Sequence, residues 1–271
     1  MAVPLPRVSL IGPALAAAAL ACSSTPRPLA QPAAPPAGTA EPAAPAAAPA
    51  ETPDRAFEAF AQRFLDDNFR HQPQAATGVG EHRYDATWPD VSAAGDARYH
   101  KFLDDALAAL ARFPRDRLSE QNRVDAAIID DGVRYGLFVI DQLRPSDSDP
   151  LSYVGLIGDG LDPLVSREFG TVESRMTSLA GRLDGIPAIV AVARQRLGHA
   201  AKIFTETAIQ QNKGLIALVE TELPPRFAQV PALKDKLTAA ATRAAAALKD
   251  LQGFLENDLL PRSDGSFRLG R

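Results

Sequence analysis

The spacing of the histidines bears on whether the chain can bind a catalytic zinc ion, because a zinc-dependent hydrolase needs imidazoles at fixed separations. The motif H-E-x-x-H puts two of them on one helix face, with the glutamate as general base. None of the four histidines here is followed by a glutamate and a second histidine, and no two lie four residues apart: His71, His82, His100 and His199. We therefore expect surface or helix-capping roles for them, and no metal ligand in this chain.

The sequence also lacks motifs for nucleophilic catalysis and for nucleotide binding. The sequence has no G-x-S-x-G segment, which would expose a serine on a sharp turn. The single cysteine, Cys22, precedes the region expected to fold. The segment GVGEHR, residues 78–83, lacks the third glycine of a dinucleotide loop and follows no predicted strand, so we interpret it as a turn. The sequence thus assigns no catalytic or cofactor-binding residue.

Two pairs of adjacent carboxylates lie inside predicted helices, at Asp104–Asp105 and Asp130–Asp131. Adjacent helical residues point about 100° apart, so such a pair is poorly arranged to share one proton or one metal ion. Asp131 falls on an apolar stripe between Ile128 and Tyr135. A buried carboxylate needs a partner, which favours an internal ion pair with an arginine over a catalytic base.

Arginines and glycines in the second half of the chain suggest two further features. Guanidinium groups could bind a substrate carboxylate in a cleft, although a solvated or ion-paired face is the favoured interpretation. Glycines four residues apart, at Gly132/Gly136 and Gly181/Gly185, predict close approach of another helix. The arginines concerned are Arg167, Arg175, Arg182, Arg194 and Arg196.

The N-terminal segment indicates export. One basic residue, Arg7, precedes an apolar run over residues 8–21, which predicts a signal peptide at residues 1–21. The segment Ala-Leu-Ala-Cys at 19–22 is similar to a bacterial lipobox, in which Cys22 would be lipidated and would anchor the chain to the membrane. Cleavage after Ala21 that leaves a free thiol is the alternative. Ser23, rather than an aspartate, favours the outer membrane, facing the periplasm. Residues 22–52, mostly Ala and Pro, predict an extended tether.

Composition limits the partners of the rest of the chain. The net charge is −4, and Lys and Arg form no dense cluster, which argues against nucleic-acid binding. No uninterrupted apolar run reaches the roughly 18 residues that would span a bilayer. Hydrophobic residues make up 46% of the sequence, enough to build a sizeable core.

Residues 53–271 predict an all-α domain of about eight helices, because apolar residues recur close to every 3.6 positions and no Val/Ile/Thr alternation suggests a sheet. Thr52, Ser119 and Thr171 are predicted helix N-caps.

The sequence also predicts which residues of this domain are buried and where two of its helices break. Phe57, Phe60 and Phe64 should form one buried stripe. Pro163 should break the stretch 151–169 in two, and the segment Gly-Ile-Pro at 185–187 should end one helix and start another. A second stripe should also face the core, at Val124, Ile128, Tyr135 and Phe138.

Three stretches together resemble one bacterial family, catalogued as domain of unknown function 885. HQPQAATGVGEHRYDATWPD, residues 71–90, is similar to its Pro-x-x-Ala-Thr-x-x-Gly opening. RLDGIPAIVAVARQRL, residues 182–197, resembles its Arg-Leu-x-x-Ile-Pro segment, and FLENDLLPRSDGSFRLG, residues 254–270, is similar to the stretch that joins its N-terminal helical half to the rest. Many members look like exported lipoproteins.

This resemblance implies a larger, all-helical protein similar to zinc carboxypeptidases, with an H-E-x-x-H-like segment in a C-terminal half that this chain lacks. Zinc is then expected only in that half, and a peptide substrate only in a full-length form. Phe267 and Leu269 would begin an element whose partners lie elsewhere. The chain would be the N-terminal portion of a peptidase-like lipoprotein, inactive alone. The alternative is a complete tethered helical binding or scaffold lipoprotein of the cell envelope.

Overall fold

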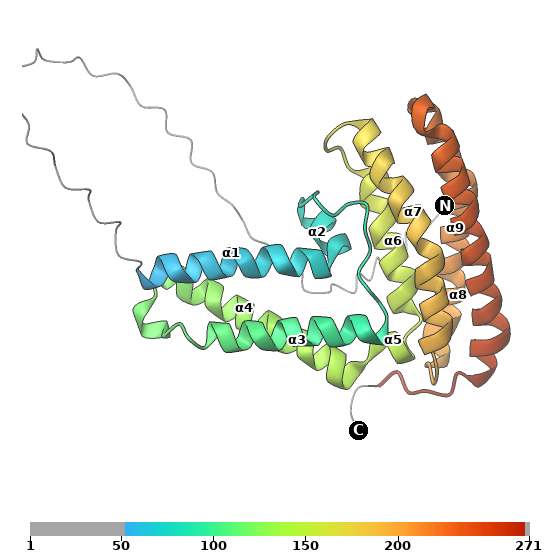
Figure 1. Cartoon of the computed structure of the whole chain (residues 1–271). Helices are drawn as coiled ribbons and strands as arrows, with labels where there is room; N and C mark the ends of the chain where they lie inside the picture. The colour runs from blue at the N-terminus through green and yellow to red at the C-terminus, as the bar shows by residue number, and fades with distance from the viewer. Residues whose placement is uncertain (1–51, 269–271) are drawn as a thin grey trace, which may run out of the picture.

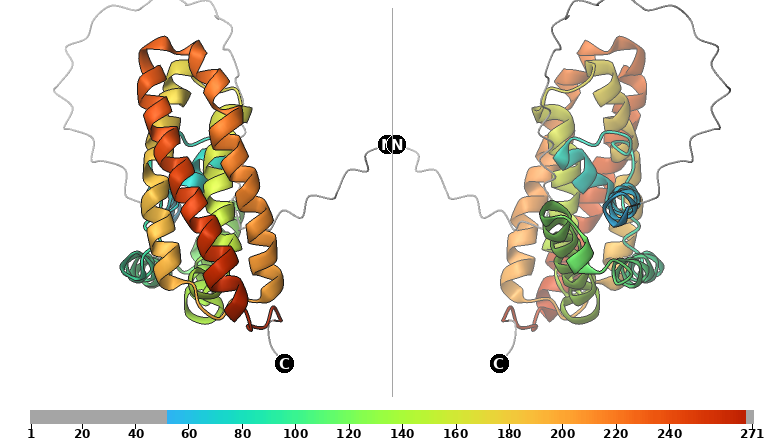
Figure 2. Two further views of the ribbon diagram at one scale, coloured as in Figure 1. Left: turned by 90° about the vertical axis from the view of Figure 1, so that its right-hand side faces the viewer. Right: turned by 90° about the vertical axis from the view of Figure 1, so that its left-hand side faces the viewer.

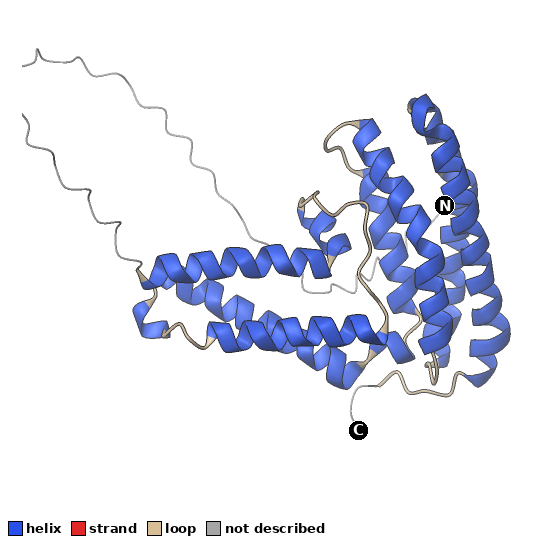
Figure 3. Cartoon of the chain, in the orientation of Figure 1, coloured by secondary structure: helices blue, strands red, loops and turns tan. Residues whose placement is uncertain are grey.

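The computed structural model describes residues 52–268, and within this range the protein is all-α (Figure 3). The described residues form nine α-helices, of which α5 is a single turn, so the expectation of about eight helices is confirmed. Strands do not form between residues 52 and 268, where one isolated bridge joins Ala201 and Gly265. The predicted signal peptide, Cys22 and all of the predicted tether except Thr52 lie outside the described residues.

The helices follow one another with short connections. Three π-helical segments continue α4, α8 and α9 directly, at η2 (Val139–Leu143), η3 (Leu218–Glu222) and η6 (Leu255–Leu259). Short 3₁₀ segments lie at η1 (Arg115–Arg117), η4 (Pro224–Gln229), η5 (Pro231–Leu233) and η7 (Leu260–Arg262). The α-helices are α1 (Pro53–His71), α2 (Pro73–Val79), α3 (Ala93–Leu110), α4 (Glu120–Phe138), α5 (Pro145–Ser148), α6 (Leu151–Ser166), α7 (Val172–Arg196), α8 (Lys202–Ala217) and α9 (Lys234–Phe254).

Helices α1, α3 and α4 form a three-helix layer with its own core (Figure 1). The predicted stripe of Phe57, Phe60 and Phe64 is buried there, as expected from its helical spacing. Phe113 packs edge-on against Phe57, with ring centroids 5.6 Å apart. Leu103 of α3 fills the groove that Gly136 leaves on α4, so the predicted close helix approach at Gly136 is confirmed.

Helices α6 to α9 form a four-helix bundle, and α7 packs between α6 and α9. The bundle runs crosswise to the three-helix layer (Figure 1). In the views of Figure 2 the bundle helices stand upright, and α1 and α3 are seen almost end-on. Alanines allow α9 to approach α7 closely, and Ala240 and Ala244 are fully buried. Among the described helices, α7 alone is long and apolar enough to cross a membrane, but half of that stretch is buried in this core. Its place in the bundle accounts for its composition.

The predicted N-caps are confirmed. The side chains of Thr52 and Ser119 accept hydrogen bonds from backbone N–H groups in the first turns of α1 and α4. At α7, Thr171 and Ser174 form a capping box. Each cap satisfies backbone donors that the helix itself cannot satisfy.

The predicted core stripe of α4 is wrong. Val124, Ile128, Tyr135 and Phe138 are exposed, and the buried residues of α4 lie about half a turn away, at Asn122, Ala126, Ile129 and Val133. Smaller side chains on that face let α1 and α3 pack closely against α4. Asp131 lies on the exposed face, so the predicted internal ion pair of Asp131 is wrong as well.

The predicted helix breaks are also wrong. Helix α6 continues through Pro163, which lies in its last turn and is buried. Helix α7 continues through Pro187 to Arg196. A proline inside a helix costs about 3 kcal/mol. Burial of the flanking Ile186, Ile189 and Val190 at about 1.5–3 kcal/mol each outweighs that cost.

Candidate functional site

A buried arginine joins the α2–α3 connection to the bundle. Arg182 on α7 is fully buried. Its Nε donates to the backbone oxygen of Asp85 at 2.7 Å, and its other guanidinium arm donates to Thr77 Oγ1 at 3.2 Å. The guanidinium lies over the ring of Trp88, 4.6 Å from the ring centroid, and Trp88 Nε1 donates back to the Arg182 backbone oxygen at 2.8 Å. One side chain thus holds both ends of the segment 77–88.

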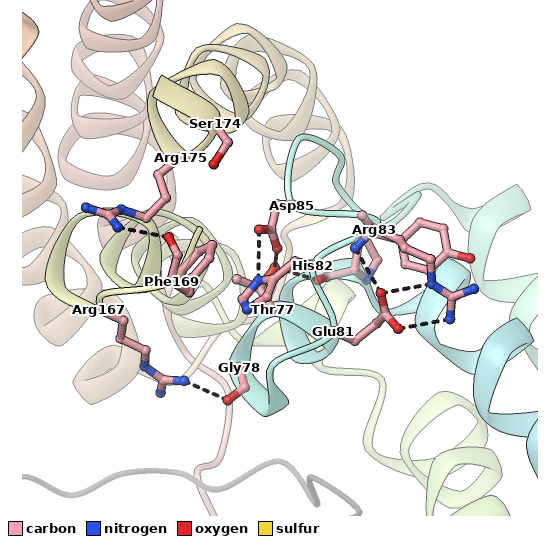
Figure 4. Close-up of polar contacts among 12 residues, drawn as sticks. Thr77, Gly78, Glu81, His82, Arg83, Asp85, Arg167, Phe169, Ser174 and Arg175 are labelled. Carbon is pink, nitrogen blue, oxygen red and sulfur yellow. Dashed lines mark hydrogen bonds and ion pairs between the residues drawn. The ribbon is translucent and has the colours of Figure 1, made fainter. Parts of the chain in front are cut away.

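Asp85 is the carboxylate of this network, and it too is buried. Thr77 Oγ1 donates to one of its oxygens at 2.7 Å, and His82 Nδ1 lies 3.0 Å from the other (Figure 4). The His82 ring stacks on Phe169, with centroids 3.7 Å apart. Burial lowers the pKa of Arg182 to about 10, and the nearby Asp85 charge partly offsets that effect. Arg182 remains charged at neutral pH.

Glycines on α7 make room for this segment. A Cβ on Gly185 would lie 2.7 Å from Trp88 Nε1, and one on Gly181 would lie 2.7 Å from the Ala86 backbone oxygen. The predicted close approach at this glycine pair therefore occurs, but the approaching element is residues 86–88 of the α2–α3 connection rather than a helix. Only residues without a side chain permit such contact on this face.

Further arginines fasten α2, α3 and the connection between them to the bundle. Arg167 donates to the Gly78 backbone oxygen at 2.7 Å, and Figure 4 shows this bond beside that of Arg175 to Phe169. Arg196 at the end of α7 donates to the Val91 backbone oxygen at 2.7 Å and pairs with both Asp96 and Asp147. Burial raises the pKa of Asp147, but hydrogen bonds from Arg196 and Arg144 outweigh it and leave that pKa below its usual value.

A cleft of about 960 Å³ lies between the three-helix layer and α6. Amide side chains from α1 and α2 line one wall, and α6 and its end contribute charged side chains to the other. Apolar side chains also line the cleft, among them the exposed Val79. The polar lining residues include Asn68, Gln72, Gln74, Asp159, Asp162 and Arg167.

One cleft wall has an irregular backbone. The π-helical segment η2 lines it, and Arg144 follows in the left-handed conformation with φ 47° and ψ 49°. A non-glycine residue in that region costs about 1–3 kcal/mol, and π-segments occur often at functional sites. Arg144 pairs with Asp147, its arm 2.8 Å from the carboxylate. The strain is therefore located where a ligand in the cleft would contact the protein.

Two uncharged side chains in the cleft wall can take part in binding. Burial raises the pKa of Tyr99 to about 12, so its hydroxyl stays protonated and donates to Asn68 Oδ1 at 3.0 Å. Gln74 Oε1 is buried with no hydrogen-bond partner among the described residues. An unsatisfied buried acceptor costs about 1–3 kcal/mol unless a donor reaches it. Accepting an N–H group from a ligand would require the Gln74 side chain to rotate toward the cleft.

The structure separates the histidines and scatters the arginines. His82 belongs to the buried network, and His100 lies between Asp104 and Asp141 on the surface. Among the described residues, no three or more His, Cys, Asp or Glu side chains form a cluster that could hold a metal ion. The five arginines do not converge on one site: Arg182 is buried, Arg167 and Arg196 line the cleft, and Arg194 pairs with Asp250 on the surface.

Sequence reasoning missed Thr77, His82, Asp85 and Trp88 as a group. The signal that could have found them is their shared place in the stretch 71–90, together with the only tryptophan of the chain. Nothing in that stretch indicated Arg182 as their partner, because the two positions are about a hundred residues apart.

These features define a class of protein, an all-helical module in which a three-helix layer is fastened crosswise to a four-helix bundle and an open cleft with polar and apolar lining lies between the layer and α6. The chain belongs to the family described as bacterial protein of unknown function, DUF885, whose family model matches residues 73–271. The membership expected from the three stretches is confirmed. None of the curated proteins matches the chain.

A solved structure has the same fold. It is described as "a putative lipoprotein of unknown function from Shewanella oneidensis", and it matches with a TM-score of 0.68 at 24% identity. The match covers 73% of this chain and 37% of that one, so the chain spans well under half of that neighbour's length.

The three family-like stretches meet in space. Pro73 is the first residue of α2, and Ala76 is buried on it. Thr77 donates a hydrogen bond to Asp85, and Gly80 ends the helix with a positive φ of 92°. This opening stretch is held by Arg182, the first residue of the second stretch. The third stretch reaches the end of the second, where an Arg262 arm donates to the Leu197 backbone oxygen at 3.1 Å. Contacts between distant segments explain why these particular residue types occur.

Proposed function

We propose that this chain is the N-terminal helical portion of an exported envelope lipoprotein, and that it binds a polypeptide substrate in the cleft without cleaving it by itself. The observation that carries this proposal is the cleft of about 960 Å³, a volume suited to a short peptide segment. The match to only 37% of the Shewanella oneidensis lipoprotein supports the view that longer relatives contain further machinery.

The lining of the cleft supports an extended polypeptide as its ligand. Peptide groups need both donors and acceptors, and the cleft offers the amides of Gln72 and Gln74 and the guanidinium of Arg144. Exposed apolar lining residues such as Val79 would contact substrate side chains. Asp159 and Asp162 on α6 have no basic side chain of residues 52–268 within ion-pair distance, which favours a basic residue on the ligand.

Zinc, which the family resemblance implies, does not fit the described residues of this chain. A zinc site needs three or four His, Cys, Asp or Glu ligands converging on one point, and residues 52–268 contain no such group. We therefore assign no hydrolytic step to these residues. In this proposal the metal and the general base belong to the part of longer relatives that lies outside the match.

The membrane location is part of the proposal. Cys22, preceded by a segment similar to a lipobox, would carry the lipid, and residues 22–52 would hold the helical domain off the outer membrane on its periplasmic side. The Shewanella oneidensis neighbour, described as a lipoprotein, supports this location. Incorporation of labelled palmitate in cells, lost in Cys22→Ser, is the test. Incorporation that persists in Cys22→Ser would contradict the anchor.

Substrate binding is tested with fluorescein-labelled casein, an unfolded polypeptide, by fluorescence anisotropy. We expect saturable binding without cleavage, and about tenfold weaker binding in Gln74→Ala and Arg144→Gly, which each remove a polar contact worth about 1.4 kcal/mol. Glycine at 144 keeps the left-handed backbone. Arg134→Ala is the matched control, because Arg134 pairs with Asp130 on the surface outside the cleft.

Two results would overturn this proposal. Casein binding that is equal in the wild type and in both cleft variants would place the ligand elsewhere. Stoichiometric zinc in the purified chain, together with casein cleavage abolished by a chelator, would make the chain a complete hydrolase.

A tethered scaffold is the second candidate, and one observation favours it. The segment after α9 returns to the bundle: Gly265 N donates to the Ala200 backbone oxygen at 3.1 Å, and Ser263 Oγ lies 2.8 Å from Thr205 Oγ1. The bundle therefore closes on itself at this edge, as a self-sufficient domain would. Phe267, two residues further on, remains exposed. Cooperative unfolding with no binding of a hydrophobic dye and no casein binding would favour this candidate.

A further inference from the structure

The outer face of α4 carries an unusual apolar stripe. Val124, Ile128, Tyr135 and Phe138 are 50%, 45%, 46% and 47% exposed. With Asp131 between them they are spaced by four, three, four and three residues, and we call these five residues the α4 seam. Single exposed apolar residues are ordinary on a protein surface, whereas a continuous row of them is not.

The spacing of the seam indicates what kind of element covers it. Alternating separations of four and three residues average 3.5, the repeat with which two helices pack side chains into each other along a coiled-coil seam. Fourteen residues at 1.5 Å rise make the seam about 21 Å long, or two heptads. A helix of similar length therefore matches the seam better than a loop or a lipid surface does.

We propose that the α4 seam docks an amphipathic helix from a polypeptide that corresponds to the part of longer relatives outside the match. This inference rests on the proposed function, in which that part supplies the reactive centre. The helix would place apolar residues against Ile128 and Phe138 and a lysine or arginine against Asp131. A carboxylate in the middle of an apolar interface needs such a cation, and it also fixes the register of the two helices.

The rest of the described surface argues for this particular face. The other large exposed apolar residues are dispersed over different elements, at Val79, Val172, Ile203 and Phe267. Ile203 on α8 has Glu206 and Thr207 at the next helical positions, so it is an isolated residue. The solved neighbour has 63% of its length outside the match, which is ample to supply a covering helix. In the described residues the seam alone combines exposure with helical periodicity.

The test uses a fluorescent label at the seam. Cys22 is the only cysteine, so Ile128→Cys in a Cys22→Ser background without residues 1–21 takes one environment-sensitive dye. The titrant is the portion of the Shewanella oneidensis lipoprotein outside the match. We expect a saturable blue shift and about tenfold weaker binding when Asp131 is changed to Lys. Ile203→Cys, at 52% exposure, is the matched control and should show no shift.

A parallel titration keeps the test decisive at low sequence identity. The matched part of the Shewanella oneidensis protein, labelled at the position equivalent to Ile128, is titrated with the same portion. No shift in either titration overturns the proposal, and so does a shift confined to the Shewanella protein. A shift that grows with the chain's own concentration would identify a second copy as the occupant, and one lost on removing residues 23–51 would identify the chain's own N-terminal segment. Both results overturn the proposal.

Failure of the seam is distinguishable from failure of the proposed function. Tyr135 of the seam also lines the cleft, whereas Ile128 does not, so Ile128→Arg should abolish docking and leave casein binding unchanged. Casein binding without docking would remove the seam proposal alone. Docking without casein binding would remove the substrate proposal alone.

Discussion

Replacing Arg182 by methionine tests whether the buried network fastens the two helical units together. Methionine keeps most of the volume but removes the charge and all donors. The loss includes two hydrogen bonds from a charged donor, at about 1.5–3 kcal/mol each, and a cation–π contact of about 1 kcal/mol with Trp88. The acceptors on Asp85 and Thr77 would remain buried.

The cost of burying the charge offsets part of this loss. The pKa of Arg182 falls from 12.5 to about 10, and at 1.36 kcal/mol per pKa unit this corresponds to about 3 kcal/mol that methionine would recover. Leaving buried acceptors unpaired costs about 1–3 kcal/mol in the variant. These contributions together predict that Arg182→Met lowers the free energy of unfolding by about 2–7 kcal/mol.

The assay is urea unfolding followed by circular dichroism and by the fluorescence of Trp88, the only tryptophan, which lies against the Arg182 guanidinium. Arg194→Met on the same helix is the matched control. Arg194 pairs with Asp250 on the surface, and exposed pairs contribute about 0–1 kcal/mol. An Arg182→Met variant within 1 kcal/mol of wild type, or an effect equal to that of Arg194→Met, would refute the reasoning.

Three further outcomes follow from the described contacts. Gly185→Ala should lower the free energy of unfolding by about 1–3 kcal/mol, because the added methyl group overpacks against Trp88. Gly155→Ala has open space around its Cβ and should raise the free energy of unfolding by up to about 1 kcal/mol. Equal effects of the two substitutions in a urea titration would contradict the close approach of Trp88 to Gly185. Burial lowers the pKa of His71 below 6.5, so its contribution to stability is present above pH 6.5 and is lost as the pH falls through the folded-state value. His71→Leu should therefore flatten the acid side of the stability–pH curve measured by urea unfolding, and an unchanged curve would contradict the burial effect. Ser119→Ala should cost about 1 kcal/mol by removing the α4 cap, measured as a shift of the urea midpoint with an unchanged slope.

Caps and buried aromatic residues were predictable because they depend on nearby residues. Thr52, Ser119 and Thr171 each bond to a backbone group three residues ahead, and such an interaction exists as soon as the local helix forms. The Phe57 stripe is larger and more apolar than any other face of α1, so it faces the core whatever packs on it. For α1 the sequence left no competing face.

The faces of α4 could not be ranked in that way. Its exposed stripe holds larger apolar side chains than its buried stripe, which relies on Ala126, Ile129 and Val133. Which stripe enters the core depends on the shape of the groove between α1 and α3, a property of other segments. The predicted helix break at Pro187 of α7 was wrong for a similar reason, because the burial that outweighs the cost of the proline comes from helices elsewhere in the chain.

By itself, the sequence determined the helical class, the N-caps at Thr52, Ser119 and Thr171, and the family, because each depends on residues within a few positions of one another or on stretches read singly. The tertiary structure alone decided that Arg182 meets Thr77 and Asp85, that a cleft opens beside them, and that the outer face of α4 stays uncovered within residues 52–268. These outcomes depend on the packing of side chains about a hundred residues apart, and the free energy of such packing depends on shape and volume that no local pattern records.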